Sequence, residues 1–148
     1  MLQTKFLSGG STKKEALKHS CLFVAEIFLG NLNYPSIDKV DIRCESADEA
    51  EELDELLWCY PEDLLLPHCL THKSQKKVFV EIGYPGSIFT AEDHKMLLNI
   101  DPDLPNQTSD YLFYYQLVIT DNGELRTRAA NTWKECVSMG LNPSFIET

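Results

Sequence analysis

The sequence predicts a single α/β domain over residues 1–148, a three-layer sandwich around a largely parallel sheet. Short apolar segments of strand length alternate along the chain with longer segments whose apolar residues recur at helical spacing. Segment 111–119, YLFYYQLVI, is nearly continuous in apolar and aromatic residues, which is typical of a strand covered on both faces. A chain of 148 residues can bury one core, so one domain is expected.

The N-terminal part of the chain predicts a strand, a turn, a helix and a second strand. The apolar segment 4–8 precedes Gly9 and Gly10, as a strand does when it ends in a turn. A helix is expected over 11–30, and 39–44 is expected to be a brief strand. The predicted apolar face of that helix comprises Leu17, Cys21, Val24, Ala25 and Phe28.

The strongly acidic stretch 48–55 predicts a helix with a solvated back. Ser46 stands three residues before Glu49, which is the spacing of a capping box at a helix start. At about 100° per residue, the stripe that faces the core comprises Ala50, Leu53 and Leu57. Trp58 falls about 80° off this stripe, at the helix end and next to an apolar run. Periodicity alone leaves both a core position and a partner contact open for Trp58.

Three further strands are expected in the second half of the chain. Segment 77–84 alternates between apolar and polar residues, and 96–100 is a short apolar run followed by the turn-forming residues DPDLPNQ. The third is the continuous apolar segment 111–119. Its lack of alternation predicts an interior strand with cover on both faces.

The last predicted element is a helix that Asp121 can cap together with Glu124, and that runs to Met139 and stops at Gly140. Its inward stripe is expected to comprise Leu125, Ala129, Thr132, Cys136 and Met139. A second stripe beside it comprises Arg126, Ala130, Trp133 and Val137. This second stripe, flanked by Lys134, suits a peptide with an apolar end and negative charges. The alternative, a tryptophan that covers the edge of the core, stays open.

Composition and charge exclude several classes of protein. The formal net charge of −10 argues against a general nucleic-acid binder, because contacts to phosphates need clustered lysine and arginine. No run of about 18 apolar residues predicts a membrane span, and the N-terminus does not resemble a signal peptide. The five cysteines are odd in number and form no Cys-x-x-Cys pair, which favours reduced thiols and a cytoplasmic protein.

The sequence holds no strong catalytic or metal-binding motif. The turn 8–14, SGGSTKK, lacks the Gly-Lys pair of a phosphate-binding Walker loop, and no Gly-x-Gly-x-x-Gly fingerprint occurs. His68, Cys69 and His72 resemble metal ligands, but structural zinc needs four ligands, and only His94 could be recruited. A loop is therefore expected there, and no Gly-x-Ser-x-Gly elbow supports hydrolysis. No metal, cofactor or catalytic residue is predicted.

Three blocks of the sequence together resemble one family. Segment 44–68 carries Cys-Glu, Leu-Asp-Glu, Leu-Trp, Pro and Pro-His in the family's order and spacing. Segments 79–86, FVEIGYPG, and 132–142, TWKECVSMGLN, follow in that order. On these blocks the chain resembles the chi subunit of bacterial DNA polymerase III. The resemblance runs through the whole chain, is specific in 44–68, and is weaker between Phe89 and Asn122.

The resemblance implies a non-catalytic adaptor of the replicase, with an α/β fold reminiscent of nucleotide-binding proteins but without a working nucleotide site. Family members bind the psi subunit of the clamp loader through one surface. They bind the C-terminal tail of single-stranded-DNA-binding protein through another, so contact with nucleic acid is indirect. The positions that correspond to the psi contact are Trp58, Pro61 and Leu65. The residues expected at the tail site are Arg126, Trp133, Lys134 and Gly140 from the family, and Val137 from the helical stripe.

The chain departs from the family pattern at three positions. Two positions that are often basic in the family read Ala130 and Thr132 here, so the tail site is expected to be weaker or to rely on Arg128. Leu65 stands where the family has an aromatic contact, which keeps an apolar anchor without a ring.

Two other functions stay open at this point. The Trp58 surface could serve a DNA-repair helicase instead of psi, because the family is known to share that surface between the two. An unrecognised α/β enzyme is the second alternative, and it would need a pocket with convergent polar groups and perturbed acids.

Overall fold

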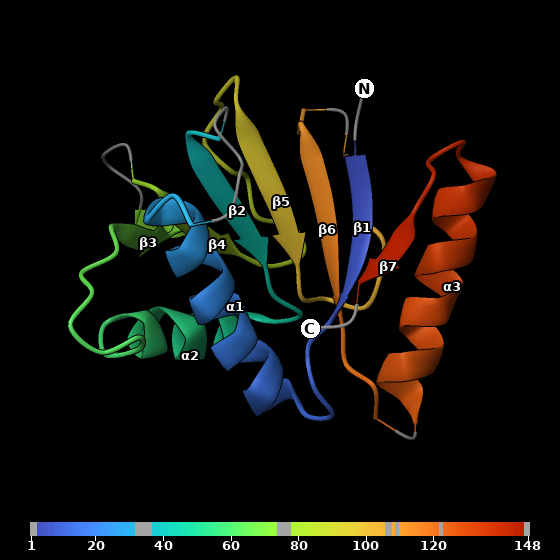
Figure 1. Cartoon of the computed structure of the whole chain (residues 1–148), viewed down its shortest axis with the longest axis horizontal. Helices are drawn as coiled ribbons and strands as arrows, with labels where there is room; N and C mark the ends of the chain where they lie inside the picture. Colours follow the sequence, from blue (N-terminus) through green and yellow to red (C-terminus); the bar gives the residue numbers. More distant parts are fainter. Residues whose placement is uncertain are drawn as a thin grey trace.

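The protein folds around one sheet with helices on both faces (Figure 1). The computed structural model describes residues 3–31, 37–73, 78–105, 108, 110–121 and 123–146. In chain order the elements are β1 (Gln3–Ser8), α1 (Lys13–Phe28), β2 (Lys39–Arg43), α2 (Ala47–Leu57), β3 (His68–Leu70), the short 3₁₀ helix η1 (Thr71–Lys73), β4 (Val80–Gly83), β5 (Lys95–Asn99), β6 (Phe113–Val118), α3 (Glu124–Ser138) and β7 (Ser144–Ile146).

Within the described residues, seven parallel strands form the sheet, in the order β3-β4-β2-β5-β6-β1-β7. The predicted α/β class and largely parallel sheet are therefore confirmed. β6 lies between β5 and β1, and all its residues from Tyr114 to Val118 are buried, as its continuous apolar sequence predicts. The sequence pattern misses the edge strands β3 and β7. Each has three residues, too few to show alternation, and the loop expected at 68–70 is wrong.

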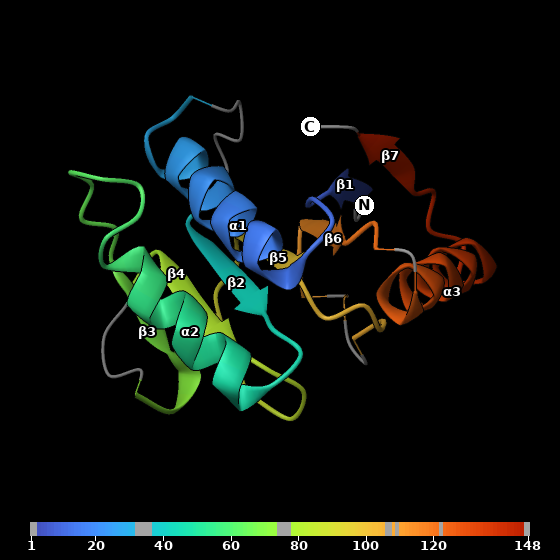
Figure 2. The same ribbon diagram turned by 90° about the horizontal axis from the view of Figure 1, so that it is seen from below.

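The helices divide between the two faces of the sheet (Figure 2). Buried residues of α1 and α2 form one core with alternate residues of β2, β4, β5 and β6. α3 packs on the other face, where Ala129 and Cys136 form a smaller core with Phe6, Leu97 and Tyr114. This arrangement confirms the predicted three-layer sandwich.

Most residues of the predicted helical stripes are buried, but the last residues of the α1 and α3 stripes are not. Phe28 and Met139, both expected to face inward, are 40% and 57% exposed. Each stands where its helix ends, so no further turn packs beside it. Phe28 instead lies against Phe79, with 5.1 Å between the ring centroids. The stripe of α2 is confirmed, with Ala50, Leu53 and Leu57 all buried.

At the start of α2, one of the two hydrogen bonds of the predicted capping box forms as expected. Ser46 Oγ accepts a hydrogen bond from the backbone N–H of Glu49 at 3.2 Å. The carboxylate of Glu49 reaches one residue further than expected and accepts from the backbone N–H of Glu45 at 3.1 Å. The predicted solvated back is confirmed, because the exposed acids of this helix are Asp48, Glu51, Glu52 and Glu55.

The cap of α3 differs from the prediction by two residues. Gly123 is the N-cap residue, whereas Asp121 lies outside the helix. Asp121 Oδ1 nevertheless accepts from the backbone N–H groups of Gly123 and Arg126, at 3.2 and 3.0 Å. Its carboxylate therefore satisfies free amides of the first turn, as a cap does. At the other end Gly140 has φ of 82°, the left-handed geometry that closes a helix.

The face of the sheet that α3 covers becomes polar on β2, β4 and β5. Lys39 Nζ lies 2.7 Å from Asp41 Oδ1 and 2.7 Å from Glu81 Oε1. Lys95 Nζ lies 3.1 Å from Asp41 Oδ2. Burial raises the pKa of Asp41, although both lysines act to lower it. All four side chains are buried, so each charge depends on its partners.

All five cysteines are free thiols. Burial raises the pKa of Cys21 to about 12 and that of Cys136 to about 11, so these side chains act as small apolar core residues. Cys59 is exposed. No helix in the described ranges has the length and apolar character that crossing a membrane requires.

Candidate partner-binding surfaces

Trp58 stands at the C-terminal end of α2 with its side chain turned away from the core. It is 62% exposed, whereas Leu57 beside it is 1% exposed. The ring packs on one side against His68, with 4.7 Å between the ring centroids and 58° between the planes. This exposure excludes a core position, the first of the two alternatives that periodicity leaves open. A large aromatic side chain in solvent is typical of an interaction surface.

The loop after α2 presents a second exposed apolar side chain. Leu65 is 77% exposed, whereas Leu66 is 4% exposed. Leu66 thus anchors the loop in the core and leaves its neighbour in solvent. Pro61 is half-buried and follows a cis peptide bond after Tyr60. Trp58 and Leu65, both expected at the psi contact, are thus exposed as a partner contact requires. We call Trp58, Pro61 and Leu65 the Trp58 surface.

His68, one of the three residues that resemble metal ligands, has a structural role. It is buried in β3, where Nδ1 lies 2.7 Å from the carbonyl oxygen of Leu66 and Nε2 lies 3.1 Å from that of Asp54. Both ring nitrogens therefore face carbonyl oxygens of the chain. The side chain of His72 lies outside the described residues. Within the part of the chain that the structure describes, no three His, Cys, Asp or Glu residues gather as a metal site.

One side of α3 combines apolar groups with cations. Trp133 is half-buried, and its ring meets Phe6 edge to face with 4.9 Å between the centroids. Val137 is 55% exposed one turn further on. Arg126 and Lys134 are exposed as well. Trp133 thus covers the edge of the core and is still partly exposed, and peptide binding at this stripe stays a prediction. We call Arg126, Trp133, Lys134 and Val137 the α3 face.

The two departures from the family pattern on α3 have different surroundings. Ala130 is exposed and adds no cation to the α3 face. Thr132 is 1% exposed, and its hydroxyl donates to the carbonyl oxygen of Pro102 at 2.5 Å. Thr132 therefore attaches α3 to the loop after β5. The position cannot hold a charged side chain in solvent without losing that attachment.

Arg128, the expected replacement cation, is already bonded within the chain. Its Nε and Nη2 donate to Asp103 at 3.0 and 2.7 Å, and its Nη1 donates to Glu45 at 2.6 Å. Hydrogen bonding to Asp103 raises the pKa of Arg128 further above its usual range. The structure thus places Arg128 in an ion cluster at the end of β2 and β5.

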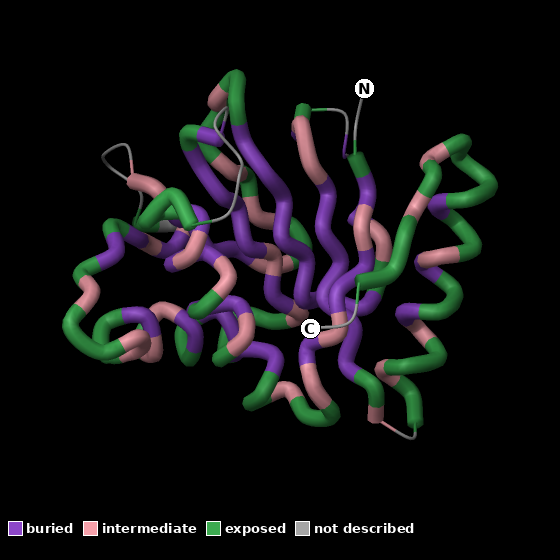
Figure 3. Tube along the Cα trace, in the orientation of Figure 1, coloured by how far each residue is buried: buried purple, intermediate pink, exposed green. Residues whose placement is uncertain are grey.

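The two candidate surfaces are far apart in the fold. α2 belongs to the layer on one face of the sheet and contacts β3 and β4, whereas α3 covers the opposite face beside β6 (Figure 1). Both helices turn exposed residues outward and buried residues toward the sheet (Figure 3). Two partners could therefore occupy them at the same time.

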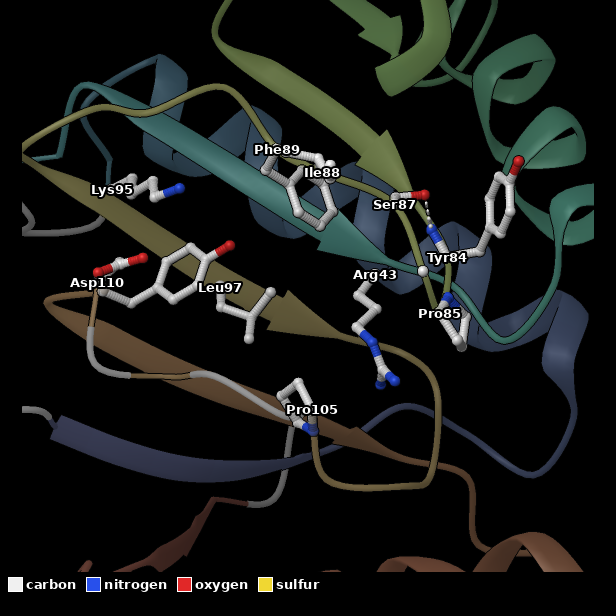
Figure 4. Close-up of a pocket in the computed structure, with 12 residues that line it drawn as sticks. Arg43, Tyr84, Pro85, Ser87, Ile88, Phe89, Lys95, Leu97, Pro105 and Asp110 are labelled. Carbon is white, nitrogen blue, oxygen red and sulfur yellow. Dashed lines mark hydrogen bonds between the residues drawn. The ribbon is translucent and has the colours of Figure 1, made fainter.

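A cavity of about 370 Å³ opens elsewhere, on the polar part of the sheet. Figure 4 shows it between the loop after β4, with Phe89, and strand β5, with Leu97. Arg43 and Lys95 also line it, but Arg43 Nη1 lies 2.6 Å from Asp101 and Lys95 Nζ lies 3.1 Å from Asp41. The cations of this cavity are thus matched by carboxylates, and none of the predicted partner-binding residues lines it.

Comparison with known proteins decides the family. The family model described as "DNA polymerase III chi subunit, HolC" matches residues 13–144. The chain belongs to this family. A relative from Haemophilus influenzae, named DNA polymerase III subunit chi, is 28% identical over 132 residues, which cover 86% of this chain and 90% of the relative. The resemblance seen in the sequence is therefore confirmed. Chi-family membership assigns the chain to DNA replication, as a subunit of the polymerase III complex.

Sequence reasoning misses the contacts that His68 and Arg128 make beside the two candidate surfaces. The cluster around Arg128 has no local signal because its partners lie far apart in the sequence, and the contact of His68 with Trp58 forms only when the loop after α2 folds back. The pair Pro67-His68 is part of the family's spacing, which was the one pointer to a role for His68 besides metal binding.

Proposed function

We propose that the chain is a non-catalytic adaptor of the DNA polymerase III holoenzyme. It binds the psi subunit of the clamp loader through the Trp58 surface. It binds the C-terminal tail of single-stranded-DNA-binding protein through the α3 face, with Gly140 closing the helix behind it. Membership of the chi family supports this proposal. The observation that carries it is the presence of two separate tryptophan-centred surfaces on helices of opposite layers.

The α3 face matches the chemistry of the tail, which is acidic and ends in an aromatic residue and a free carboxylate. Trp133 and Val137 offer apolar surface for the aromatic side chain, and Arg126 and Lys134 offer N–H donors for the carboxylate. The net charge of −10 opposes an acidic peptide at long range. The local cations must therefore act within about 10 Å, the screening length at 0.1 M salt.

Titration of the purified chain with a synthetic tail peptide tests this function. We expect modest affinity that weakens with added salt, because the cations are exposed. Trp133→Ala should remove the apolar contact, and Arg126→Ala should weaken binding and flatten its salt dependence. Lys14→Ala is the matched control, since Lys14 is an exposed cation on α1 in the other layer. Absence of binding, or equal behaviour of Arg126→Ala and Lys14→Ala, would show that the tail site is wrongly assigned.

The Trp58 surface needs a separate test, because psi and a DNA-repair helicase both fit an exposed aromatic anchor. Pull-down with the wild-type chain and with Trp58→Ala from the native cell identifies the partner that depends on this side chain. Recovery of psi by the wild-type chain and its loss with Trp58→Ala support the adaptor. Recovery of a helicase alone would contradict the adaptor and support an accessory protein of a DNA-repair helicase. The adaptor has no nucleotide hydrolysis of its own, so the purified chain should show no saturable ATP binding at micromolar concentration.

A further inference from the structure

Arg128 is held by carboxylates of this chain rather than presented to solvent. Its Nε and Nη2 atoms donate to the two carboxylate oxygens of Asp103, and its Nη1 atom donates to Oε2 of Glu45. A bidentate arginine–carboxylate pair fixes the plane of the guanidinium as well as its charge. Arg128 thus connects α3 to the loop after β5 and to the residue before the cap of α2.

The charges around Arg128 leave little attraction for another anion. Asp101 Oδ1 lies 3.6 Å from its Nη2, and Glu124 Oε1 lies 3.7 Å from its Nη1. Together with Asp103 and Glu45, four carboxylates surround one guanidinium. The neighbouring cations are paired with the same acids, as Lys13 is with Glu45 and Arg43 with Asp101. A carboxylate from a ligand would therefore meet more negative than positive charge at this place.

Apart from the bonds of Arg128, α3 buries few side chains completely. Its fully buried side chains are small, with Ala129, Thr132 and Cys136 facing the sheet. Thr132 bonds Pro102, and Arg128 bonds Asp103 in the same loop. Partly buried Leu125 and Trp133 add apolar contact, and the polar bonds of Thr132 and Arg128 tie the helix to the loop after β5. Any tilt would move Arg126 and Trp133 together, because both stand on this helix.

We propose that Arg128 is a positioning residue of the tail site. It clamps α3 against the loop after β5, so that Arg126 and Trp133 face the tail together, and it does not itself receive the tail's carboxylate. This inference rests on the tail binding proposed above. It replaces the role that the sequence suggests for Arg128, that of a substitute cation in contact with the ligand.

The variant Asp103→Asn distinguishes a ligand-contacting Arg128 from a positioning Arg128, because the two roles predict opposite changes in the affinity for the tail peptide. If Arg128 contacted the tail, Asp103→Asn would free its guanidinium and strengthen binding. If Arg128 positions α3, Asp103→Asn should weaken tail binding by about threefold or more, the range of couplings carried through packed elements. Asp103 is 58% exposed in its side chain, so this variant should stay folded. Glu124→Gln is the matched control, because it removes one negative charge 3.7 Å from the same guanidinium without breaking the clamp.

The salt dependence of tail binding by Arg128→Met distinguishes the two roles of Arg128 a second time. Loss of a positioning residue should lower the affinity for the tail peptide and keep the slope of affinity against salt, whereas Arg126→Ala should flatten that slope. Stronger binding with Asp103→Asn, or a slope flattened equally by Arg128→Met and Arg126→Ala, overturns the positioning role. Rescue of affinity by Asp103→Glu, which restores a carboxylate, supports it.

Tryptophan emission, measured without the tail peptide, tests the positioning role of Arg128 independently of the proposed tail binding. In a Trp58→Phe background, Trp133 is the remaining tryptophan and its emission reports the contact with Phe6. Asp103→Asn should shift this emission to longer wavelength well below the melting temperature, and Glu124→Gln should not. If the wild-type chain binds no tail, the tail function fails, and the emission still decides whether Arg128 positions α3. Unchanged emission in Asp103→Asn overturns the clamp.

Discussion

At the scale of single residues, Trp58 combines exposure with a fixed orientation. Its ring is 62% exposed, yet it packs on His68, whose nitrogens face two backbone carbonyl oxygens. A side chain that is already oriented loses less conformational freedom on binding. Aromatic anchors of this kind carry most of the binding energy in protein interfaces. Leu65 adds exposed apolar surface nearby in the chain, without a ring that packs on the protein.

Trp58→Ala should cost the complex with psi about 2 kcal/mol or more, as the loss of a central aromatic anchor does. The melting temperature of the isolated chain should change little, because most of the ring is already in solvent. Calorimetric titration with psi and a thermal melt measure the two effects. Ile88→Ala is the control, since Ile88 is 90% exposed but lies outside the Trp58 surface. A variant that unfolds, or that binds psi as the Ile88 control does, would contradict this assignment.

At the scale of elements, the sequence predicts the features that local periodicity determines. The stripe of α2 and the buried strand β6 follow from residues a few positions apart, and both are confirmed. The burial of Thr132 follows from its place on the predicted inward stripe, whereas its bond to Pro102 and the exposure of Trp58 depend on the loops and strands that pack beside them. Arg128 bonds Glu45, which is 83 residues away, and Asp103, which is 25 residues away. No local pattern contains such contacts, so the structure alone shows that α3 has one cation in a clamp and others on its surface.

The clamp of α3 should make stability depend on pH. Hydrogen bonds from Arg128 lower the pKa of Asp103. For Glu45, partial burial raises the pKa, but the bonds from Lys13 and Arg128 outweigh it and leave the pKa lowered. A carboxylate whose pKa is lowered by folding stabilises the protein above its unfolded pKa and loses that effect as the pH falls through its folded pKa. The contribution is therefore complete at neutral pH and is lost in acid, below about pH 4.

Thermal melts of the wild-type chain and Arg128→Met across this pH range test the expectation. We expect the variant to melt about 2–4 °C lower at pH 7, the shift that about 1 kcal/mol produces in a chain of this size. The gap should close as the pH falls toward 3. Arg126→Met is the control, because its side chain is exposed on the same helix, and its gap should be small throughout. An equal gap for Arg128→Met at pH 7 and pH 3 would show that the ion pairs do not stabilise the fold.

At the scale of the whole molecule, the sheet separates the two proposed partners. α2 and α3 belong to different layers, with the strands between them. The ion cluster does reach from α3 to Glu45, which precedes the N-terminal cap of α2. Trp58 stands at the opposite end of that helix. About 1.5 Å of rise per residue puts more than about 15 Å of helix between the cluster and the Trp58 surface.

Binding at the two surfaces should therefore be additive. We expect Trp58→Ala to leave the affinity for the tail peptide unchanged, and Trp133→Ala to leave the affinity for psi unchanged. In the double variant each loss should equal that of its single variant within about 0.5 kcal/mol, as for sites without shared contacts. Calorimetric titration of all four chains with each ligand closes the cycle, and saturation with psi before adding the tail repeats the test in the assembled state. A coupling well above 0.5 kcal/mol would mean that binding at one surface changes the affinity at the other through the ion cluster. Asp103→Asn, which opens the clamp of α3, should then abolish that coupling.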